Sequence, residues 1–178
     1  MRITDERKYW DKNALDHDVD KKYISDVSVE DCLKDLPEMV GNVLEIGCGV
    51  GRLLKDGYVG VDISTEMLEI CRSRKPNRVV HNNGRTLPFE ENEFDFVYSY
   101  LVFQHIPEEA VMGYIDEAYR VLKPGGKFIF QCILGTEDEP FSKHLDPEWL
   151  DSKLGFYESY TLKDSVAHHQ WTICEAIK

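Results

Sequence analysis

VLEIGCGVGRLL, at residues 43–54, runs a four-residue strand pattern directly into three glycines at alternate positions. Residues 43–46 can form a short buried strand. Gly47, Gly49 and Gly51 then follow, and glycine permits positive φ and leaves no Cβ between the backbone and a ligand. Because ligands bind beyond the carboxyl ends of strands in an open parallel sheet, this stretch predicts a nucleotide-type ligand site. The alternative for any one of these glycines is a plain tight turn.

Strand and helix patterns alternate along the rest of the chain. Short segments rich in β-branched or aromatic residues predict further strands at 58–62, 79–80, 94–99 and 127–133. Helical patterns are SVEDCLKDL from Ser28, STEMLEICRSRKP from its N-cap Ser64, and PEEAVMGYIDEAYRVLKPGG from Pro107. Strands that alternate with helices in this way favour right-handed crossovers between parallel strands.

The fold class that follows is α/β, a doubly wound, mainly parallel sheet with helices on both faces. Two strand patterns near the C-terminus, around 157–162 and 171–178, have no helix-length segment between them. Strands joined so closely pair antiparallel, which predicts an antiparallel C-terminal edge pair. The chain has 178 residues and shows no internal repeat or linker, so we expect a single domain.

Composition narrows the classes of partner. The formal net charge is −12, from 33 acidic against 21 basic residues, and this field repels phosphate backbones and anionic membranes. Nucleic acid is therefore an unlikely partner, and no apolar run reaches the roughly 20 residues of a membrane span. The charged stretch MRITDERKYWDK is unlike a secretory signal. Five widely spaced cysteines without a C-x-x-C motif indicate reduced thiols, a cytoplasmic protein and no metal site.

The spacing of the glycines separates two kinds of nucleotide site. A nicotinamide dinucleotide fold requires G-x-G-x-x-G, whose third position here is Arg52, whereas the pattern present is G-x-G-x-G. VLEIGCGVG resembles the first motif of class I S-adenosylmethionine-dependent methyltransferases. Further stretches of the chain resemble the following motifs in the same order, over about 41–134: YVGVDIS, GRTLPFEENEFDFVYSYLVFQHIP and RVLKPGGKFIF.

The resemblance, which is strongest to the small-molecule-type subgroup, implies the class I methyltransferase fold. It also implies S-adenosyl-L-methionine as cofactor, S-adenosyl-L-homocysteine as product and a small-molecule substrate. Within one domain at 1–178, it implies an N-terminal helical segment or lid (1–40), a cofactor-binding core (41–134) and a substrate-side segment with the edge strands (135–178). The acceptor atom and the oligomeric state stay open.

The same resemblance assigns cofactor contacts. Asp62, at a strand end, holds the ribose hydroxyls, and a carboxylate can accept both hydrogen bonds of a diol; the alternative is a turn or capping Asp. Glu45 faces the methionine amino group, unless it is an outward-facing strand acid. Asn83 replaces the acid that usually receives the adenine amino group. The predicted cofactor-binding residues are Glu45, Gly47, Cys48, Gly49, Gly51, Asp62, Ile63, Asn83, Gly84 and Tyr100.

The connection after the glycines departs from the usual pattern. Only about ten residues separate Gly51 from Asp62, against about twenty after the fingerprint of dinucleotide folds. We therefore expect a first crossover helix shortened to RLLKD, at 52–56, and a less rigid glycine loop.

Candidates for substrate chemistry cluster after the strand at 94–99. His105 matches a histidine frequent in the family and is the candidate general base; the alternative is a structural turn or capping histidine. His144, His168 and His169 are other candidates, unless they are surface residues. Methyl transfer from a sulfonium needs positioning and does not require a base. The predicted substrate-side residues are Tyr9, Trp10, Gln104 and His144. Tyr9 and Trp10 close over the cofactor or, alternatively, pack on the sheet edge.

The sequence thus predicts S-adenosylmethionine-dependent methyl transfer to a small molecule. Two alternatives remain at this stage. One is a non-catalytic S-adenosylmethionine-binding partner protein, which the short first helix and Asn83 keep open. The other is a methyltransferase that acts on a protein side chain, which an open groove would favour over an enclosed pocket.

Overall fold

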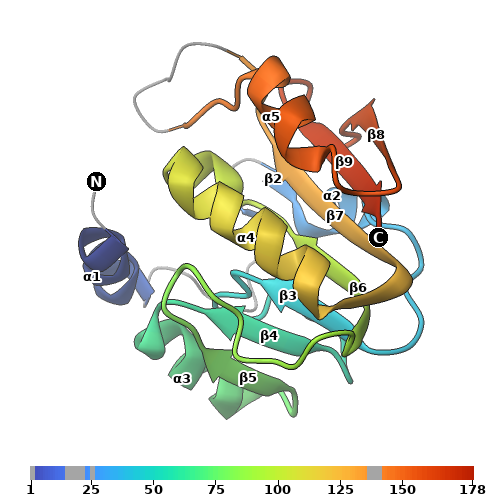
Figure 1. Ribbon diagram of the computed structural model, residues 1–178. Coiled ribbons are helices and arrows are strands. Elements are labelled where there is room, and N and C mark those ends of the chain that lie inside the picture. The colour runs from blue at the N-terminus through green and yellow to red at the C-terminus, as the bar shows by residue number, and fades with distance from the viewer. Residues whose placement is uncertain (1–2, 15–22, 25–26, 136–141) are drawn as a thin grey trace.

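The structure, a computed structural model, describes residues 3–14, 23–24, 27–135 and 142–178. Its centre is a seven-stranded sheet with the order β5-β4-β3-β6-β7-β9-β8 (Figure 1). The parallel strands are β3 (Val43–Ile46), β4 (Val59–Asp62), β5 (Arg78–His81), β6 (Phe94–Ser99) and β7 (Leu122–Cys132). Strand β9 (Thr172–Ile177) lies between β7 and β8 (Ser159–Asp164) and is antiparallel to both. A separate antiparallel ribbon joins β1 (Tyr23–Ile24) to β2 (Val27–Ser28).

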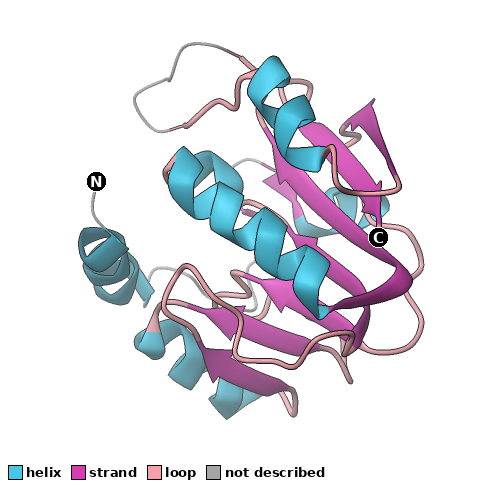
Figure 2. Ribbon diagram, viewed as in Figure 1, coloured by secondary structure: helices cyan, strands magenta, loops and turns pink. Residues whose placement is uncertain are grey.

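Helices cover both faces of the sheet, as Figure 2 shows. On one face lie α4 (Glu108–Val121) and α5 (Pro147–Leu154). On the other lie α2 (Val29–Lys34) and α3 (Thr65–Arg74). Helix α1 (Ile3–Asn13) contacts α3, and a 3-10 turn, η2 (Phe103–His105), precedes α4. The doubly wound class, the helices on both faces and the antiparallel C-terminal pair are confirmed.

The alternation of side chains along β3 builds two cores. Leu44 and Ile46 point to the face covered by α4, where they join a large aromatic and aliphatic cluster. Val43 points to the opposite face, toward α2, and packs in a second cluster with Tyr98. Strand β3 is therefore buried on both faces, as expected of a central parallel strand. Its two neighbours, β4 and β6, lead to opposite halves of the sheet, so a crevice opens at its carboxyl end.

The predicted helix at 52–56 is wrong. The chain between β3 and β4 forms turns and bends, without a helix. Gly51 and Gly57 have φ of +85° and +86°, which an α-helix does not include. The five residues left between these two glycines are too few to form a stable helix. Leu53 and Leu54 instead pack in two different clusters, which anchors the segment without helical hydrogen bonds.

Helix α5 was not among the sequence-based predictions. The Asp146 side chain caps it by accepting a hydrogen bond from the Trp149 N–H at 2.8 Å, and Pro147 occupies its first turn. An Asp-Pro pair before a helical pattern is a recognised start signal. Strand β7 also begins earlier than the prediction of 127–133, because the LKPGG segment already continues the strand.

Candidate functional site

A cavity of about 520 Å³ lies beyond the carboxyl ends of β3, β4 and β6. It gathers most of the site residues that the sequence predicts. From the cofactor set, its lining includes Glu45, Gly47, Cys48, Gly49, Asp62, Ile63, Gly84 and Tyr100. From the substrate side and the candidate base, it includes Tyr9, Trp10, Gln104 and His105. Gly51, Asn83 and His144 do not line it. The geometry thus brings these side chains together; their contacts with a ligand stay a prediction.

The glycine turn after β3 is shaped by close packing. Gly47 has φ +74°, and a Cβ there would stand 2.3 Å from a methyl carbon of Val102. Gly51 lies against α3 instead of the cavity, since a Cβ on it would stand 2.7 Å from the Cys71 sulfur. Glycine is therefore required at position 51 because the turn packs closely against α3. Gly51 does not help to form the cavity.

Asp62 ties the glycine turn to the start of α3. Its Oδ2 accepts from the Gly49 N–H and its Oδ1 from the Ser64 N–H, both at 2.8 Å. The side chain is 7% exposed, and burial raises the pKa of Asp62 although these backbone hydrogen bonds oppose the shift. Asp62 therefore stabilises the turn and also lines the cavity, and its contact with a ribose stays a prediction.

Glu45 is a buried acid and not an outward-facing one. Its Oε2 lies 2.8 Å from the hydroxyl of Tyr98, which also lies 3.1 Å from the Leu53 carbonyl oxygen. Burial raises the pKa of Glu45 to about 8. The Tyr98 hydroxyl is the donor in both contacts and has one proton, so Glu45 and the Leu53 carbonyl oxygen share it. The raised pKa favours the protonated carboxyl group near neutral pH in the unliganded protein.

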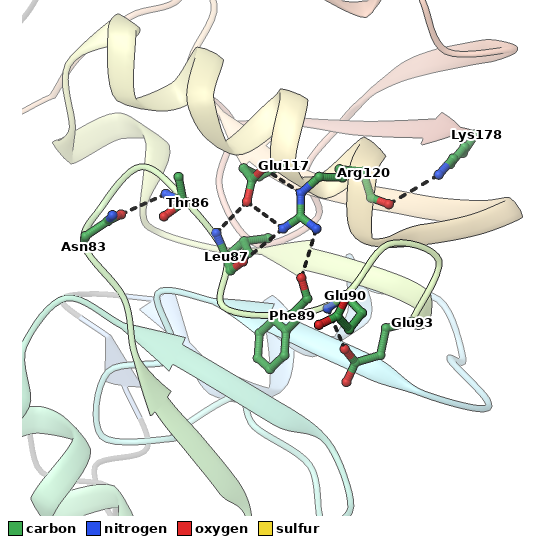
Figure 3. Close-up of polar contacts among 9 residues, drawn as sticks. All are labelled: Asn83, Thr86, Leu87, Phe89, Glu90, Glu93, Glu117, Arg120 and Lys178. Carbon is green, nitrogen blue, oxygen red and sulfur yellow. Dashed lines mark hydrogen bonds and ion pairs between the residues drawn. The ribbon is translucent and has the colours of Figure 1, made fainter.

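The side-chain carboxamide of Asn83 forms hydrogen bonds within its own loop. Its Oδ1 accepts hydrogen bonds from the Arg85 N–H at 2.9 Å and the Thr86 N–H at 2.8 Å, the latter drawn in Figure 3. The oxygen assigned to adenine is thus occupied. Next to it, Asn82 is buried and donates to the Tyr114 hydroxyl at 2.8 Å. The Oδ1 atom of Asn82 is buried and has no hydrogen-bond partner in the described part of the chain.

The loop that carries Asn83 and Gly84 is held on α4 by one arginine. Arg120 donates to the carbonyl oxygens of Phe89 at 2.9 Å and Leu87 at 3.0 Å, and Glu117 accepts from the Leu87 N–H at 2.7 Å (Figure 3). Arg120 also pairs with Glu117 at 2.8 Å. This clamp explains why LPF stays in place without a helix between β5 and β6.

A directed chain of hydrogen bonds reaches His105. The Leu101 N–H donates to Gln131 Oε1 at 3.1 Å, and Gln131 Nε2 then donates to Gln104 Oε1 at 2.9 Å. Gln104 Nε2 lies 3.2 Å from His105 Nε2. A backbone N–H can only donate, so it fixes the orientation of both amides, and His105 Nε2 must accept. Neutral His105 therefore carries its proton on Nδ1. Sequence reasoning missed Gln131, because nothing in a strand pattern marks a buried glutamine.

The N-terminal helix brings aromatic rings to the cavity. The Trp10 and His105 rings lie 5.7 Å apart, edge to face, and Tyr9 packs on Trp10 at 5.1 Å. Arg7, on the same helix, donates to the Thr65 hydroxyl at the start of α3. Helix α1 thus docks against α3, and its aromatic pair lines the cavity instead of packing on the sheet edge.

The turn between β8 and β9 forms another wall. Asp35 is buried and accepts from the Tyr100 hydroxyl at 2.5 Å, the Ser165 hydroxyl at 2.5 Å and the Val166 N–H at 2.7 Å. Trp171 packs edge to face on Tyr100 at 5.9 Å. Asp35 therefore fixes the turn on the sheet, and this turn contributes to the lining His168, Gln170 and Trp171. No local signal predicts this, since the turn reaches the cavity through tertiary packing.

His144 lies beside Gly135, where a Cβ would stand 2.7 Å from its Nδ1, and it is not part of the lining. Ser142 lines the cavity in its place. Other lining residues absent from the predicted set are Val50, Arg52, Leu53, Met67, Leu101, Val102, Ile106, Ala110, Tyr114 and Ile133. Among the residues that the structure describes, no three His, Cys, Asp or Glu side chains gather to hold a metal ion. In the same residues, no helix has the length and apolar character to cross a membrane.

Comparison with known proteins places the chain among its relatives. Residues 44–130 match the family model described as a methyltransferase domain. An uncharacterised protein of Methanocaldococcus jannaschii is 37% identical over 131 residues, covering 70% of this chain and 60% of the relative. Demethylmenaquinone methyltransferase of Oceanobacillus iheyensis is 33% identical over 120 residues, covering 58% of this chain and 49% of the enzyme. The chain thus spans about half to three fifths of the length of these relatives.

A solved structure supports the fold over almost the whole chain. Haemonchus contortus phosphoethanolamine N-methyltransferase 1, in complex with phosphoethanolamine and S-adenosylhomocysteine, superposes with a TM-score of 0.75. The match covers 98% of this chain and 48% of that chain at 14% sequence identity. At this identity the likeness shows the fold.

Proposed function

The chain belongs to the class I S-adenosylmethionine-dependent methyltransferase family, and we propose that it binds S-adenosylmethionine and methylates a small molecule. The observation that carries this proposal is the cavity itself. It places the glycine turn after β3 and Asp62 at the end of β4 in one space, beside Glu45. S-adenosylhomocysteine is the expected product.

The residues present fit the cofactor. Asp62 offers a buried carboxylate to the ribose, and Gly47 and Gly49 allow a ligand to approach the backbone. Glu45 lies where the methionine amino group is expected. For the adenine amino group we propose Asn82 in place of Asn83, because the Asn82 oxygen is buried beside the cavity-lining Tyr114 and lacks a partner in the described chain. An acceptor of this kind is costly to bury unless a ligand satisfies it.

Positioning is the main work of the protein in this proposal. The sulfonium of the cofactor supplies an activated methyl group, so holding the acceptor in line with it gives most of the rate. His105, Gln104 and Ser142 also line the cavity and are available to hold the acceptor. Because Nε2 of His105 accepts from Gln104, His105 suits a positioning role better than proton abstraction.

A small acceptor is favoured over a protein side chain. Aromatic rings of α1 and the turn between β8 and β9 both contribute to the lining, so side chains from two distant segments border the cavity, which favours a small acceptor. The relative from Oceanobacillus iheyensis and the Haemonchus contortus structure carry names of small-molecule methyltransferases. A non-catalytic binding protein remains the alternative from another class. The unpaired cysteines support a cytoplasmic location.

Calorimetry and a turnover assay test the proposal. S-adenosylhomocysteine should bind, and NADH should not. Incubation with S-adenosylmethionine and a panel of metabolite and peptide acceptors should yield S-adenosylhomocysteine with a metabolite. Binding without turnover across the panel would favour the non-catalytic alternative, and turnover with peptides alone would favour a protein substrate. No binding at millimolar ligand would contradict the cofactor assignment.

A further inference from the structure

Two stacked rings on the turn between β8 and β9 border the cavity. His168 and Trp171 both line it, and their ring centroids lie 4.8 Å apart with an angle of 30° between the planes. We call this pair the ring wall. The turn lies in the half of the sheet beyond β6 and β7, whereas Asp62 ends β4 in the other half. The ring wall therefore reaches the cavity from the half of the sheet opposite to Asp62.

The ring wall is held in place by a hydrogen-bond network around Asp35, which is buried. Its carboxylate accepts from the hydroxyls of Ser165 and Tyr100, each at 2.5 Å. The Ser165 hydroxyl oxygen in turn accepts from the His168 N–H at 3.2 Å. Tyr100 packs edge to face on Trp171. One carboxylate thus positions both the turn and the ring that supports Trp171, so the ring wall is formed before a ligand binds.

The ring wall carries no charge. The Gln170 N–H donates to His168 Nδ1 at 3.3 Å. Because a backbone N–H can only donate, Nδ1 must accept, which an imidazolium cannot do. The acids in the described lining are Glu45 and Asp62, which are bonded to Tyr98 and to backbone N–H groups. Both belong to the proposed cofactor contacts. The described lining therefore offers no spare carboxylate to an ammonium group at the ring wall, and an uncharged ligand group suits it better.

We propose that the ring wall forms a subsite for an uncharged, flat aromatic ring of the methyl acceptor. This proposal rests on the proposed function and specifies its substrate class. Apolar ring surface gains free energy when a ligand covers it and removes it from water. An aromatic ligand gains further from stacked or edge-to-face geometry, which an aliphatic ring of the same size lacks. The preference for an aromatic over an aliphatic ring is therefore the property to measure.

Phenol and cyclohexanol, which differ only in the aromaticity of the ring, are the probes. Each is titrated into protein saturated with S-adenosylhomocysteine, and ligand-observed NMR gives its affinity. We expect phenol to bind about 2- to 10-fold more tightly, the range for one aromatic pair. The chain has three tryptophans, so the indole N–H signal of Trp171 is identified by its loss in Trp171→Phe. Phenol should shift this signal in wild type more than cyclohexanol does, because only phenol has a ring current.

Variants locate the preference. Trp171→Leu removes the ring and keeps an apolar side chain, and Trp171→Phe restores an aromatic ring. The matched control is Trp149→Leu, which removes a tryptophan of α5 that does not belong to the described lining. Trp171→Leu should bind the two probes within about twofold of each other, while Trp171→Phe and Trp149→Leu keep the preference for phenol. The affinity for S-adenosylhomocysteine should stay within about twofold of wild type in all three.

Three results overturn the proposal. One is equal binding of phenol and cyclohexanol to wild type, and another is a preference for phenol that Trp171→Leu retains. The third is tetramethylammonium that binds more tightly than phenol in a manner dependent on Trp171, which would identify a cationic acceptor. Circular dichroism establishes that the variants fold. If Trp171→Leu does not, the indole signal of wild type decides, and a signal that phenol leaves unshifted overturns the proposal.

Calorimetry with S-adenosylhomocysteine separates this proposal from the proposed function. Wild type that binds S-adenosylhomocysteine without a preference for phenol leaves the proposed function intact and overturns the ring subsite. Wild type that fails to bind S-adenosylhomocysteine contradicts the proposed function. In that case the titrations of phenol and cyclohexanol into the unliganded protein still decide whether the ring wall binds an aromatic ring.

Discussion

Gln104 donates its carboxamide N–H to the imidazole of His105, Nε2 to Nε2, across 3.2 Å. The direction is set at the start of this chain of hydrogen bonds. There the Leu101 N–H donates to Gln131, which in turn donates to Gln104. An imidazolium has no lone pair, so protonated His105 could not accept this hydrogen bond. This chain of hydrogen bonds therefore stabilises the neutral ring of His105 with its proton on Nδ1.

We expect His105→Ala to lower turnover by less than about 10-fold, the value of one neutral hydrogen bond. Cofactor affinity should not change, because the substitution leaves the glycine turn and Asp62 intact. Steady-state kinetics with the acceptor identified by the panel, together with calorimetry, gives both numbers. A loss of about 10²–10⁴-fold at an unchanged melting temperature would instead identify a general base.

Gln131→Leu should destabilise the protein. The side chain is fully buried, and its loss removes the partners of the Leu101 N–H and of Gln104 Oε1. Unsatisfied buried groups cost about 1–3 kcal/mol each, so urea denaturation should show a decrease of about that size in the free energy of unfolding. A change below about 0.5 kcal/mol, the range of ordinary surface substitutions, would mean that the chain of amides is not structurally required.

Glu45 should release a proton when the cofactor binds. Burial raises the pKa of Glu45 to about 8 from an ordinary value of 4.5, so the carboxyl group is protonated at pH 7. Pairing with the methionine ammonium requires the carboxylate, and about one proton should therefore leave. Calorimetry at pH 7 in buffers of different ionisation enthalpy measures this number, and the affinity should rise with pH up to about 8. Glu45→Gln should abolish proton release; a wild type without it would contradict the assigned contact.

The same pKa gives a prediction for stability. Because the folded-state pKa of Glu45 is raised, its contribution to stability is complete below pH 4.5 and is lost as the pH rises toward 8. Glu45→Gln should therefore flatten the decrease in melting temperature of the unliganded protein over this interval. Parallel profiles for the two proteins would show that Glu45 is ionised in the folded state.

Asp62→Ala should weaken S-adenosylhomocysteine binding by about 1.5–3 kcal/mol, the range for hydrogen bonds to a charged group. Part of this loss comes through the Gly49 N–H, which the substitution releases.

Asn82→Ala should cost about 0.5–1.5 kcal/mol of binding, since a neutral acceptor is removed. Asn83→Ala should act on stability more than on affinity, because its oxygen caps its own turn. A larger loss of affinity in Asn83→Ala than in Asn82→Ala would restore Asn83 as the adenine contact.

Arg120→Ala should lower the free energy of unfolding by about 1.5–3 kcal/mol, because charge-assisted hydrogen bonds to Leu87 and Phe89 are lost. Lys34→Ala is the control. Lys34 lies in an exposed pair with Asp31 at 2.8 Å, which is worth about 0–1 kcal/mol. The hydrogen bonds of Arg120 also lower the pKa of Glu117, so the difference between wild type and Arg120→Ala should shrink as the pH falls below 4.5. Equal losses in the two variants would rule out the clamp.

The sequence by itself determined the sheet and the ends of its strands. Periodicity placed β3, β4, β6 and the capped helix α3, because alternating apolar residues and an N-cap serine are local signals. Glycine spacing and Asp62 located the cavity for the same reason, since both lie at strand ends. Local signals were misleading between β3 and β4, where two positive-φ glycines prevent the expected helix, and at the start of β7, which begins at Leu122.

Only the tertiary structure decided which side chains complete the cavity and what state they are in. Trp171 and His168 reach it on a turn that Asp35 holds from far away in the chain. The choice between Asn82 and Asn83 depends on which amide faces inward, and the raised pKa of Glu45 depends on its burial. Such properties come from packing between segments distant in sequence, which sets desolvation and hydrogen-bond partners, and no local pattern encodes them.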